Sequence, residues 1–451
     1  MSPLHRSARV ALAATLGLLV CTGCAVPFIS RIGPAGADGT ATARIGRFRG
    51  WRKCVHLDNG LVHMAIVPQI GGRTLDYSLD GWNYLAIGRR ELGTTLDDNP
   101  LGQYRHYGGQ FAQLLPETRW RGLQSRYPAD LFMGEYEARV VGEAAGPVAA
   151  VELTGPPELA TGTRLVRCIE LFAGSTRARI TDILSNTRLV PQEWGIHGIV
   201  QFKGHATRNG VLKGKEKADG QMGLLVPLNP KSRYRGGVRQ LIADRRSAGG
   251  VRGQWSTSRL PGLLELRYHR LFSKAAVDPA LPWVAIVDRA SDHVLIHKCS
   301  VPDKAVLTTG PAGRYPMIEL QSLGPVAKLG PGKSTSLVQE WFAARCPSPV
   351  VDVTDAGVVS SPLTLLRDDG GKVWAEGTFG VFYVGKAVLV FARADGGELA
   401  RVACGPVHPH RPFALKRAIE LPKGTARVTL DILDDAGKCV GDLGKILLGA
   451  S

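Results

Sequence analysis

The chain lacks several sequence features that would assign it to a well-known protein class. After residue 24 it has no Cys-x-x-Cys pair, so a zinc ribbon or a dithiol redox motif has no support. It also lacks a Gly-rich phosphate loop and a Ser-His-Asp signature. The net charge is +17, yet no five like charges follow one another and no basic stripe alternates with aromatics. Nucleic acid is therefore not an expected partner. A diffusely basic surface and attraction to anionic sugars both remain open.

Long apolar segments are also scarce. The only one, residues 10–20, follows a basic start and is shorter than the ~18 residues that would cross a bilayer. It leads to Cys24, and this ending resembles a bacterial lipobox, with Cys21 where Leu is usual. We therefore expect residues 1–24 to be a lipoprotein signal and the exported chain to be lipid-anchored at Cys24. Cleavage near residues 35–37, which would give a periplasmic or secreted protein, is the alternative.

Cysteine and histidine give little support for bridges or metal sites. Of eight cysteines, two lie in the signal region, and the other six are widely spaced. A disulfide between Cys404 and Cys439 is favoured because both lie in one short segment, while buried free thiols are an equally good interpretation. The pairs His408/His410 and His293/His297 lack a clear carboxylate or cysteine partner. No metal and no cofactor are expected.

The rest of the sequence predicts an all-β protein. Short segments that alternate polar and apolar residues recur between Gly, Pro, Asn and Asp, and few stretches keep a helical period. Residues 25–45 are rich in Gly and Ala and indicate a tether. A Cys-Pro-Ser-Pro stretch from Cys346 indicates a boundary. It divides a main domain, residues 46–346, from a C-terminal domain, residues 350–451, expected to be a small immunoglobulin-like β-sandwich.

A series of short motifs runs through the main domain. They are, in order, Asn-Gly-Leu-Val at 59–62, Gly-Gly-Arg at 71–73, His-Tyr-Gly-Gly at 106–109 with Trp120, Asn186, Gly-Ile-His-Gly at 195–198, Ile-Glu-Leu-Gln at 318–321 and Pro-Gly at 331–332. In this order the motifs resemble the galactose mutarotase-like superfamily, which includes the aldose 1-epimerases. The resemblance covers roughly residues 45–345 and implies a β-supersandwich that holds a sugar on the concave face of its large sheet. His197 lacks the aromatic-Asn-Leu sequence that usually follows the epimerase histidine.

The resemblance also implies an acid–base pair. Glu319 would take the proton from the anomeric hydroxyl and His197 would protonate the ring oxygen, so that the ring opens and closes again from the other face. His106 would bind or orient the sugar. Each has a structural alternative: Glu319 as a solvent-facing strand residue, His197 as an interior histidine and His106 as a polar turn residue.

Four further residues are candidates for substrate binding. The aromatic rings of Trp120 and Trp194 are possible stacking platforms for sugar rings, although such residues more often belong to the core. The guanidinium groups of Arg73 and Arg105 are suited to a carboxylate or phosphate on the sugar, or are ordinary strand arginines.

Three functions are compatible with these residues. The first is an exported aldose-epimerase-like isomerase acting through Glu319 and His197. The second is a non-catalytic carbohydrate-binding or cell-envelope lipoprotein that keeps the sheet without the acid–base pair. The third, a polysaccharide lyase or hydrolase, would need another acid or base on the same face. In all three the partner is a sugar or polysaccharide, and the membrane is reached only through the lipid anchor.

Overall fold

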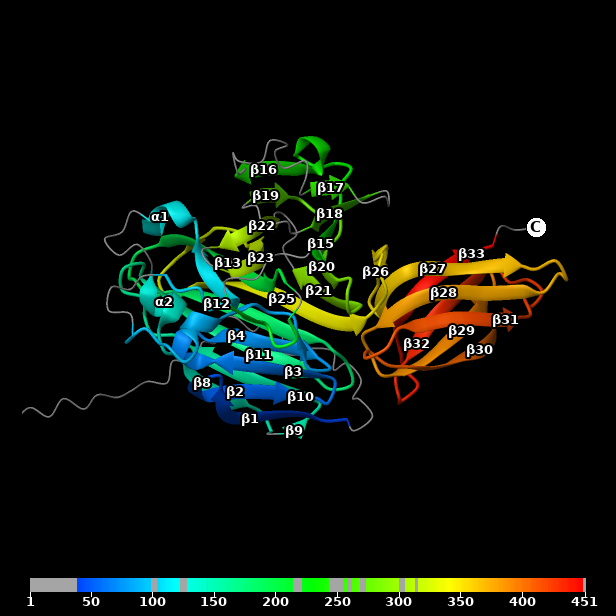
Figure 1. The fold of residues 1–451 in the computed structure, drawn as a ribbon, viewed down its shortest axis with the longest axis horizontal. Helices are drawn as coiled ribbons and strands as arrows, with labels where there is room; N and C mark the ends of the chain where they lie inside the picture. The colour runs from blue at the N-terminus through cyan, green and yellow to red at the C-terminus, as the bar shows by residue number, and fades with distance from the viewer. Residues whose placement is uncertain are drawn as a thin grey trace, which may run out of the picture. The chain divides into compact units, whose positions relative to one another are not determined.

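Strands make up most of the structure, and helices are limited to short segments (Figure 1). The all-β prediction is confirmed. The computed structural model describes residues 39–98, 104–121, 128–143, 145–205, 207–213, 221–242, 255–257, 262–267, 273–299, 305–312 and 315–448, all within one compact unit, residues 33–451. Cys24 and the signal segment lie outside the described residues. The helices are α1 (Glu117–Arg121) and α2 (Ala129–Met133), with 3₁₀ turns η1 (Pro68–Ile70), η2 (Arg89–Glu91) and η3 (Arg235–Gly237).

A sheet of 13 strands, here called the large sheet, carries the candidate site. Its first strand begins at Ala41, so residues 41–45 belong to this sheet and the predicted tether is too long by these residues. The strands in spatial order are β16 (Val238–Ile242), β19 (Ser273–Val277), β22 (Ala305–Ala312), β23 (Tyr315–Leu323), β13 (Gln192–Lys203), β7 (Gly109–Leu115), β4 (Arg73–Leu79), β3 (Val62–Val67), β2 (Trp51–Asp58), β1 (Ala41–Phe48) and β9 (Ala145–Gly146), with β24 (Ala327–Leu329) on β13 and β5 (Trp82–Asn83) on β4.

A second sheet of ten strands packs against the large sheet. A separate short parallel pair consists of β14 (Val211–Leu212) and β6 (Ile87–Gly88). The strands of the second sheet, in spatial order, are β17 (Trp255–Thr257), β18 (Leu263–Arg267), β15 (Met222–Pro227), β20 (Trp283–Asp288), β21 (His293–Cys299), β25 (Ser334–Arg345), β12 (Ala178–Asn186), β11 (Thr163–Phe172), β10 (Val148–Thr154) and β8 (Glu137–Val141).

The hydrophobic core lies between these two sheets. In β12 every second residue is buried, from Ala178 to Asn186, as expected of a strand that covers a core with one face. In the large sheet, Ile318 and Leu320 of β23 and Val200 of β13 belong to the same core. Because side chains alternate along a strand, the residues of β13 and β23 between these core residues point to the opposite face of the large sheet.

One buried arginine of the second sheet, paired with an aspartate of the same sheet, joins the two sheets across this core. Arg167 of β11 and Asp182 of β12 are both fully buried and lie 2.7 Å apart, Nε to Oδ1. The same guanidinium donates to the carbonyl of Gly72, 2.7 Å away, and to the side chain of Gln110 on β7. All three nitrogens of Arg167 thus have acceptors, as a buried charge requires.

The last hundred residues form two further sheets of four strands each with a hydrophobic core of their own. The backbone amide of Thr176 donates to the carbonyl of Phe382, 2.8 Å away, and Phe382 packs against Phe342 of β25. These strands are β26 (Asp352–Val353), β27 (Gly357–Arg367), β28 (Val373–Val381) and β31 (Phe413–Ile419) in one sheet, and β30 (Glu398–Val407), β29 (Gly385–Ala392), β32 (Arg427–Leu433) and β33 (Cys439–Leu447) in the other.

The predicted bridge between Cys404 and Cys439 is wrong. Cys404 lies in β30 and Cys439 begins β33, and the strands β29 and β32 separate them in the sheet. Neighbouring strands are about 4.8 Å apart, so the two cysteines are too distant for a disulfide. Both side chains are thiols in the structure. Within the described residues, no helix combines the length and the apolar character needed to cross a bilayer.

Candidate functional site

Polar side chains gather on the face of the large sheet that points away from the core, here called the outer face. On β13 this face receives His197 and Gln201, because the alternate residues Ile196 and Val200 lie in the core. Gln201 pairs in register with Glu319 of β23. Residues directly opposite each other on paired strands share a face, so Glu319 lies on the outer face beside Gln201.

Two amides hold the Glu319 carboxylate. Gln201 donates from Nε2 to one carboxylate oxygen at 2.7 Å, and Gln321 donates to the other. The side chain is half-buried rather than turned into bulk solvent. Neutral donors on both oxygens fix the orientation of the carboxylate, and acceptor positions remain because each oxygen has two lone pairs.

His197 lies near the same cluster but is closed off. It is 1% exposed, and its Nδ1 is 3.6 Å from a carboxylate oxygen of Glu117. Burial lowers its pKa to about 3, with Lys274 as a second cause, while a hydrogen bond with Gln321 acts in the opposite direction. The ring is therefore neutral near pH 7. The predicted role of His197 as an imidazolium acid does not fit this environment.

A fully buried guanidinium adds a positive charge to the outer face. Arg73 of β4 lies over the ring of Phe111, 3.7 Å from its centroid, and Nη1 donates to the carbonyl of Gly108 at 2.9 Å. Its Nε has no hydrogen-bond partner among the described residues. Burial lowers the pKa of Arg73, and the nearby Tyr104 hydroxyl opposes this shift. An arginine with an unused buried N–H is suited to receive an acceptor from a ligand.

Tyr104 connects this guanidinium to the carboxylate. Its hydroxyl is 3.5 Å from Nε2 of Gln201, and the same hydroxyl raises the pKa of Arg73. Its ring meets His106 edge to face, with centroids 5.0 Å apart. Both side chains are half-buried. His106 is thus a partly accessible imidazole beside the Glu319 cluster.

The glycine pair that follows His106 has a local structural reason. Gly108 and Gly109 have φ values of 87° and 71°. A Cβ on Gly108 would lie 1.9 Å from the carbonyl oxygen of Ala86, and one on Gly109 would lie 2.3 Å from that of Thr74. Glycine is required because the backbones pass so closely. The pair brings the Tyr104–His106 segment beside the sheet.

Both predicted tryptophan platforms belong to the core. Trp120 of α1 is 2% exposed, donates from its indole N–H to the carbonyl of Leu114 and meets Phe132 edge to face. Trp194 of β13 is 4% exposed and faces the same side as Ile196. Neither ring offers a face to a sugar, so the stacking role predicted for them is wrong.

Two other residues of the sequence motifs have local roles. Arg105 donates to the backbone carbonyl of Asp98 at 2.6 Å, and within the described part of the chain no contact places it in the Glu319 cluster. Asn186 donates to the carbonyls of Val190 and Leu329, and its own carbonyl accepts from the amide of Gly332. Asn186 therefore fastens the turn before β25.

Sequence reasoning missed three members of the cluster: Gln201, Gln321 and Tyr104. A signal for two of them was present, because Gln321 is two residues after Glu319 and Gln201 is four after His197 on strands of period two. Tyr104 lies outside the strands, shortly before β7, and its contact with Gln201 depends on how the chain enters β7.

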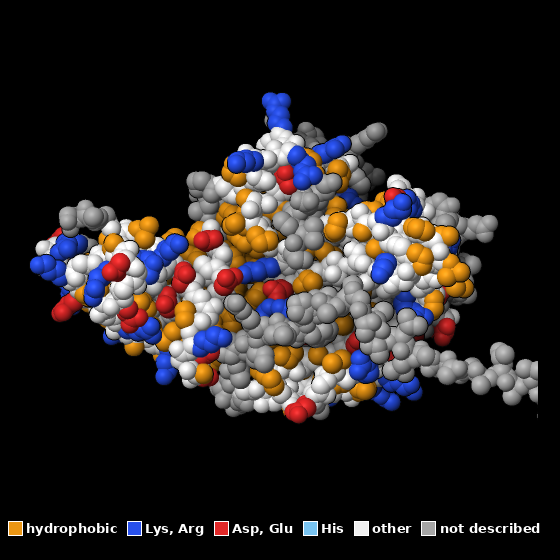
Figure 2. All heavy atoms as spheres, turned by 180° about the vertical axis from the view of Figure 1, so that it is seen from behind, with side chains coloured by type: hydrophobic (Ala, Val, Ile, Leu, Met, Phe, Trp, Pro, Cys, Tyr) orange, Lys and Arg blue, Asp and Glu red, His pale blue; other side chains and the backbone are white. Residues whose placement is uncertain are grey.

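On the face seen in Figure 2, basic side chains are spread over the surface rather than gathered in one place. Figure 2 shows Lys and Arg side chains on one face of the molecule with Asp and Glu among them. This distribution fits the diffusely basic surface that was one interpretation of the net charge of +17.

No protein-family model and no curated protein matches the chain. Solved structures similar to it include a Synechocystis protein with 16% identity and a TM-score of 0.42, where the match covers 66% of this chain and 98% of the other. A galactose mutarotase-like protein from Clostridium acetobutylicum has 11% identity and a TM-score of 0.41, covering 68% and 98%. Galactose 1-epimerase from Lactobacillus acidophilus has 14% identity and a TM-score of 0.41, covering 67% and 98%.

Proposed function

We propose that this protein binds a carbohydrate on the outer face of the large sheet. The observation that carries the proposal is the Glu319 carboxylate, held by two glutamine amides on the same face as the buried guanidinium of Arg73. A sugar hydroxyl both donates and accepts hydrogen bonds. It would donate to Glu319 while a neighbouring sugar oxygen accepts from Arg73 or Gln201.

The same geometry supports anomer interconversion as a second candidate. Glu319 would take the proton of the anomeric hydroxyl as the bond between the anomeric carbon and the ring oxygen breaks, and an imidazolium would give its proton to that oxygen. We assign the acid to His106, because it is partly accessible beside Tyr104. His197, with a pKa of about 3, would instead support Gln321 as a neutral ring.

Binding and catalysis separate in one set of experiments. Calorimetric titration with a panel of aldoses measures binding, and NMR exchange spectroscopy of the two anomers measures turnover. Glu319→Gln should weaken binding and abolish any acceleration of exchange, with Glu137→Gln, an exposed change on β8, as the matched control. Binding without accelerated exchange would leave a non-catalytic carbohydrate-binding protein. Equal behaviour of Glu319→Gln and wild type in both assays would refute the site.

We also propose export and lipid attachment at Cys24, supported by the basic start, the short apolar run and the lipobox-like ending. Expression in a bacterium fed radiolabelled palmitate should label the wild-type chain and not Cys24→Ser. Cys21→Leu is the control, because it removes the neighbouring cysteine, supplies the residue usual at that lipobox position and leaves the acceptor in place. Export without any label would favour the periplasmic or secreted alternative.

A further inference from the structure

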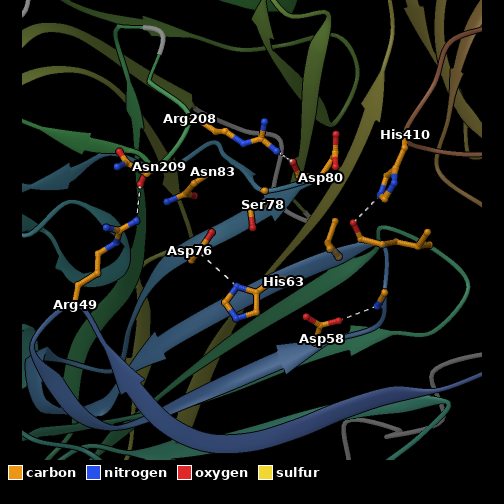
Figure 3. Close-up of a pocket in the computed structure, with 14 residues that line it drawn as sticks. Arg49, Asp58, His63, Asp76, Ser78, Asp80, Asn83, Arg208, Asn209 and His410 are labelled. Carbon is orange, nitrogen blue, oxygen red and sulfur yellow. Dashed lines mark hydrogen bonds and ion pairs between the residues drawn. The ribbon is translucent and has the colours of Figure 1, made fainter.

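A second polar cavity lies on the outer face, away from Glu319. Its volume is about 560 Å³, within the range of small-molecule sites. Figure 3 shows side chains from β3, β4 and the segment around Arg208 surrounding a common space. The polar residues that line it are Arg49, Asp58, His63, Asp76, Ser78, Asp80, Asn83, Arg208, Asn209 and His410.

A β-bulge brings this cavity onto the same face as Arg73. The pairing of β3 with β4 shifts by one residue between Ala65 and Ile66, so that Ile66 pairs with Thr74 and Ala65 pairs with Asp76. Without this shift, Asp76 would face the core when Arg73 faces outward. The two side chains are three residues apart, about 10 Å along the strand.

A chain of polar side chains fixes the floor of the cavity. His63 Nδ1 lies 3.4 Å from Asp76 Oδ2, and His63 Nε2 lies 3.0 Å from Nδ1 of His56 (Figure 3 shows the first contact). The other carboxylate oxygen of Asp76, Oδ1, is buried and has no hydrogen-bond partner in the part of the chain that the structure describes. A buried acceptor without a donor is a position for a donor from a ligand.

The guanidinium groups of the cavity are partly engaged with the backbone. Arg208 donates from Nη2 to the carbonyl of Asp80 at 2.7 Å, and Arg49 donates to that of Asn209 at 3.1 Å. The lining thus contains three carboxylates, from Asp58, Asp76 and Asp80, but only two arginines, and each arginine already donates to a backbone carbonyl. This lining disfavours a ligand with several negative charges.

One residue of the C-terminal part of the chain also lines the cavity. His410, in the connection between β30 and β31, lines the cavity, and its Nε2 lies 2.9 Å from the carbonyl oxygen of Leu61. Leu61 belongs to the turn between β2 and β3, where the side chain of Asn59 accepts from the amides of Leu61 and Val62. The cavity is therefore built from both parts of the chain.

We propose that this cavity is a second saccharide site, which takes a sugar unit rich in hydroxyl groups and free of carboxylate or sulfate. Carboxylates, amides, a serine and guanidinium groups alternate around it, and together they offer acceptors and donors to a ring that carries both. Asp76 Oδ1 accepts from a sugar hydroxyl, and the Asn83 and Arg208 side chains donate to neighbouring oxygens. The proposal is independent of the Glu319 site.

The test follows the His63 ring by NMR in protein labelled with ¹³C and ¹⁵N at histidine, the signal being assigned with His63→Gln. The probes are cellotetraose, galactotetraose, chitosan tetraose and tetragalacturonate. At least one of the first three should shift the His63 signal with saturation, and tetragalacturonate should not. No saturable shift with any neutral or amino probe, or a stronger shift with tetragalacturonate, overturns the proposal.

Variants separate this site from the Glu319 site. Asp80→Asn suits the turn between β4 and β5, where Asp80 and Gly81 have φ values of 50° and 68°, because Asn-Gly favours such a turn. Asp76→Asn and Asp80→Asn should each weaken the His63 response about tenfold or more, since hydrogen bonds to charged groups are the stronger ones. Glu319→Gln and the exposed control Asp369→Asn should leave it unchanged. Wild-type affinity in both cavity variants would refute the assignment.

Discussion

Two arginines, one on each side of the large sheet, are completely buried and have opposite hydrogen-bonding environments. Arg167 lies in the core and donates from all three nitrogens, to Asp182, Gly72 and Gln110. Arg73 lies on the outer face, with one protein carbonyl as acceptor and an Nε without a partner among the described residues. Burial alone therefore does not identify a functional residue. The difference lies in whether the protein itself satisfies the buried charge.

The largest expected effect concerns the core side of this comparison. Arg167→Met should lower the free energy of unfolding by about 3–5 kcal/mol, because it leaves the Asp182 carboxylate buried without its partner. Urea denaturation followed by circular dichroism measures the change. The double variant Arg167→Met/Asp182→Leu should recover much of the loss. A single variant as stable as wild type would contradict the structural role of the pair.

The buried histidines should give a smaller effect that depends on pH. Burial lowers the pKa values of His197, His293 and His297 to about 3, whereas each is near 6.5 in the unfolded chain. Between these values the unfolded state binds more protons, so stability falls as the pH drops from about 6.5 toward 3. The maximum slope is about 1.4 kcal/mol per pH unit for each histidine.

His297 offers the cleanest test of this pH dependence. Its Nδ1 accepts from the indole N–H of Trp341 at 3.0 Å, and its Nε2 lies 3.0 Å from the hydroxyl of Ser322. His297→Gln removes the titrating group, so urea denaturation from pH 3.5 to 7 should show a shallower dependence on pH than wild type. His63→Gln, on the outer face, is the control. Equal slopes for wild type and His297→Gln would show that His297 is not held neutral.

The smallest effect on stability is expected for Arg73. Arg73→Met should change the free energy of unfolding by less than about 1.5 kcal/mol, because its hydrogen bonds go to neutral groups, the Gly108 carbonyl and the Tyr104 hydroxyl, and it has no carboxylate partner among the described residues. The same change should weaken sugar binding at the Glu319 site about tenfold or more, as measured by calorimetric titration. A loss of stability as large as that of Arg167→Met, with sugar binding unchanged, would show that Arg73 is a structural residue and not a ligand-binding one.

Local patterns predicted part of this site. Ile318 and Leu320 on either side of Glu319 placed its side chain away from the core, because a strand alternates its faces. The same rule could not show that Trp194 belongs to the core, since the sequence does not say which face of β13 is the buried one. The core position of Trp120 was not recognised because Trp120 lies in a short helix with too few residues to show a period.

The strands at the start of the chain were also missed in part. Residues 41–45 include small and polar side chains and indicated a tether, yet they pair with β2 as the second-last strand of the large sheet. The last strand, β9, pairs only with Ala41 and Thr42, and most of β1 is not buried, so its sequence carries few apolar residues. β7 supplies Phe111 beneath Arg73, and the motifs on either side of it, at 106–109 and at Trp120, did not single out this residue.

The sequence by itself determined the all-β class and the side of its strand on which Glu319 lies, because both follow from short-range alternation along the chain. Tertiary structure alone decided that Gln201, Gln321 and Tyr104 surround that carboxylate and that His197 is sealed and neutral. It also decided, through a one-residue bulge, that Asp76 shares a face with Arg73. Register and burial depend on strands that are distant in sequence, and no local pattern indicates which strands will pair.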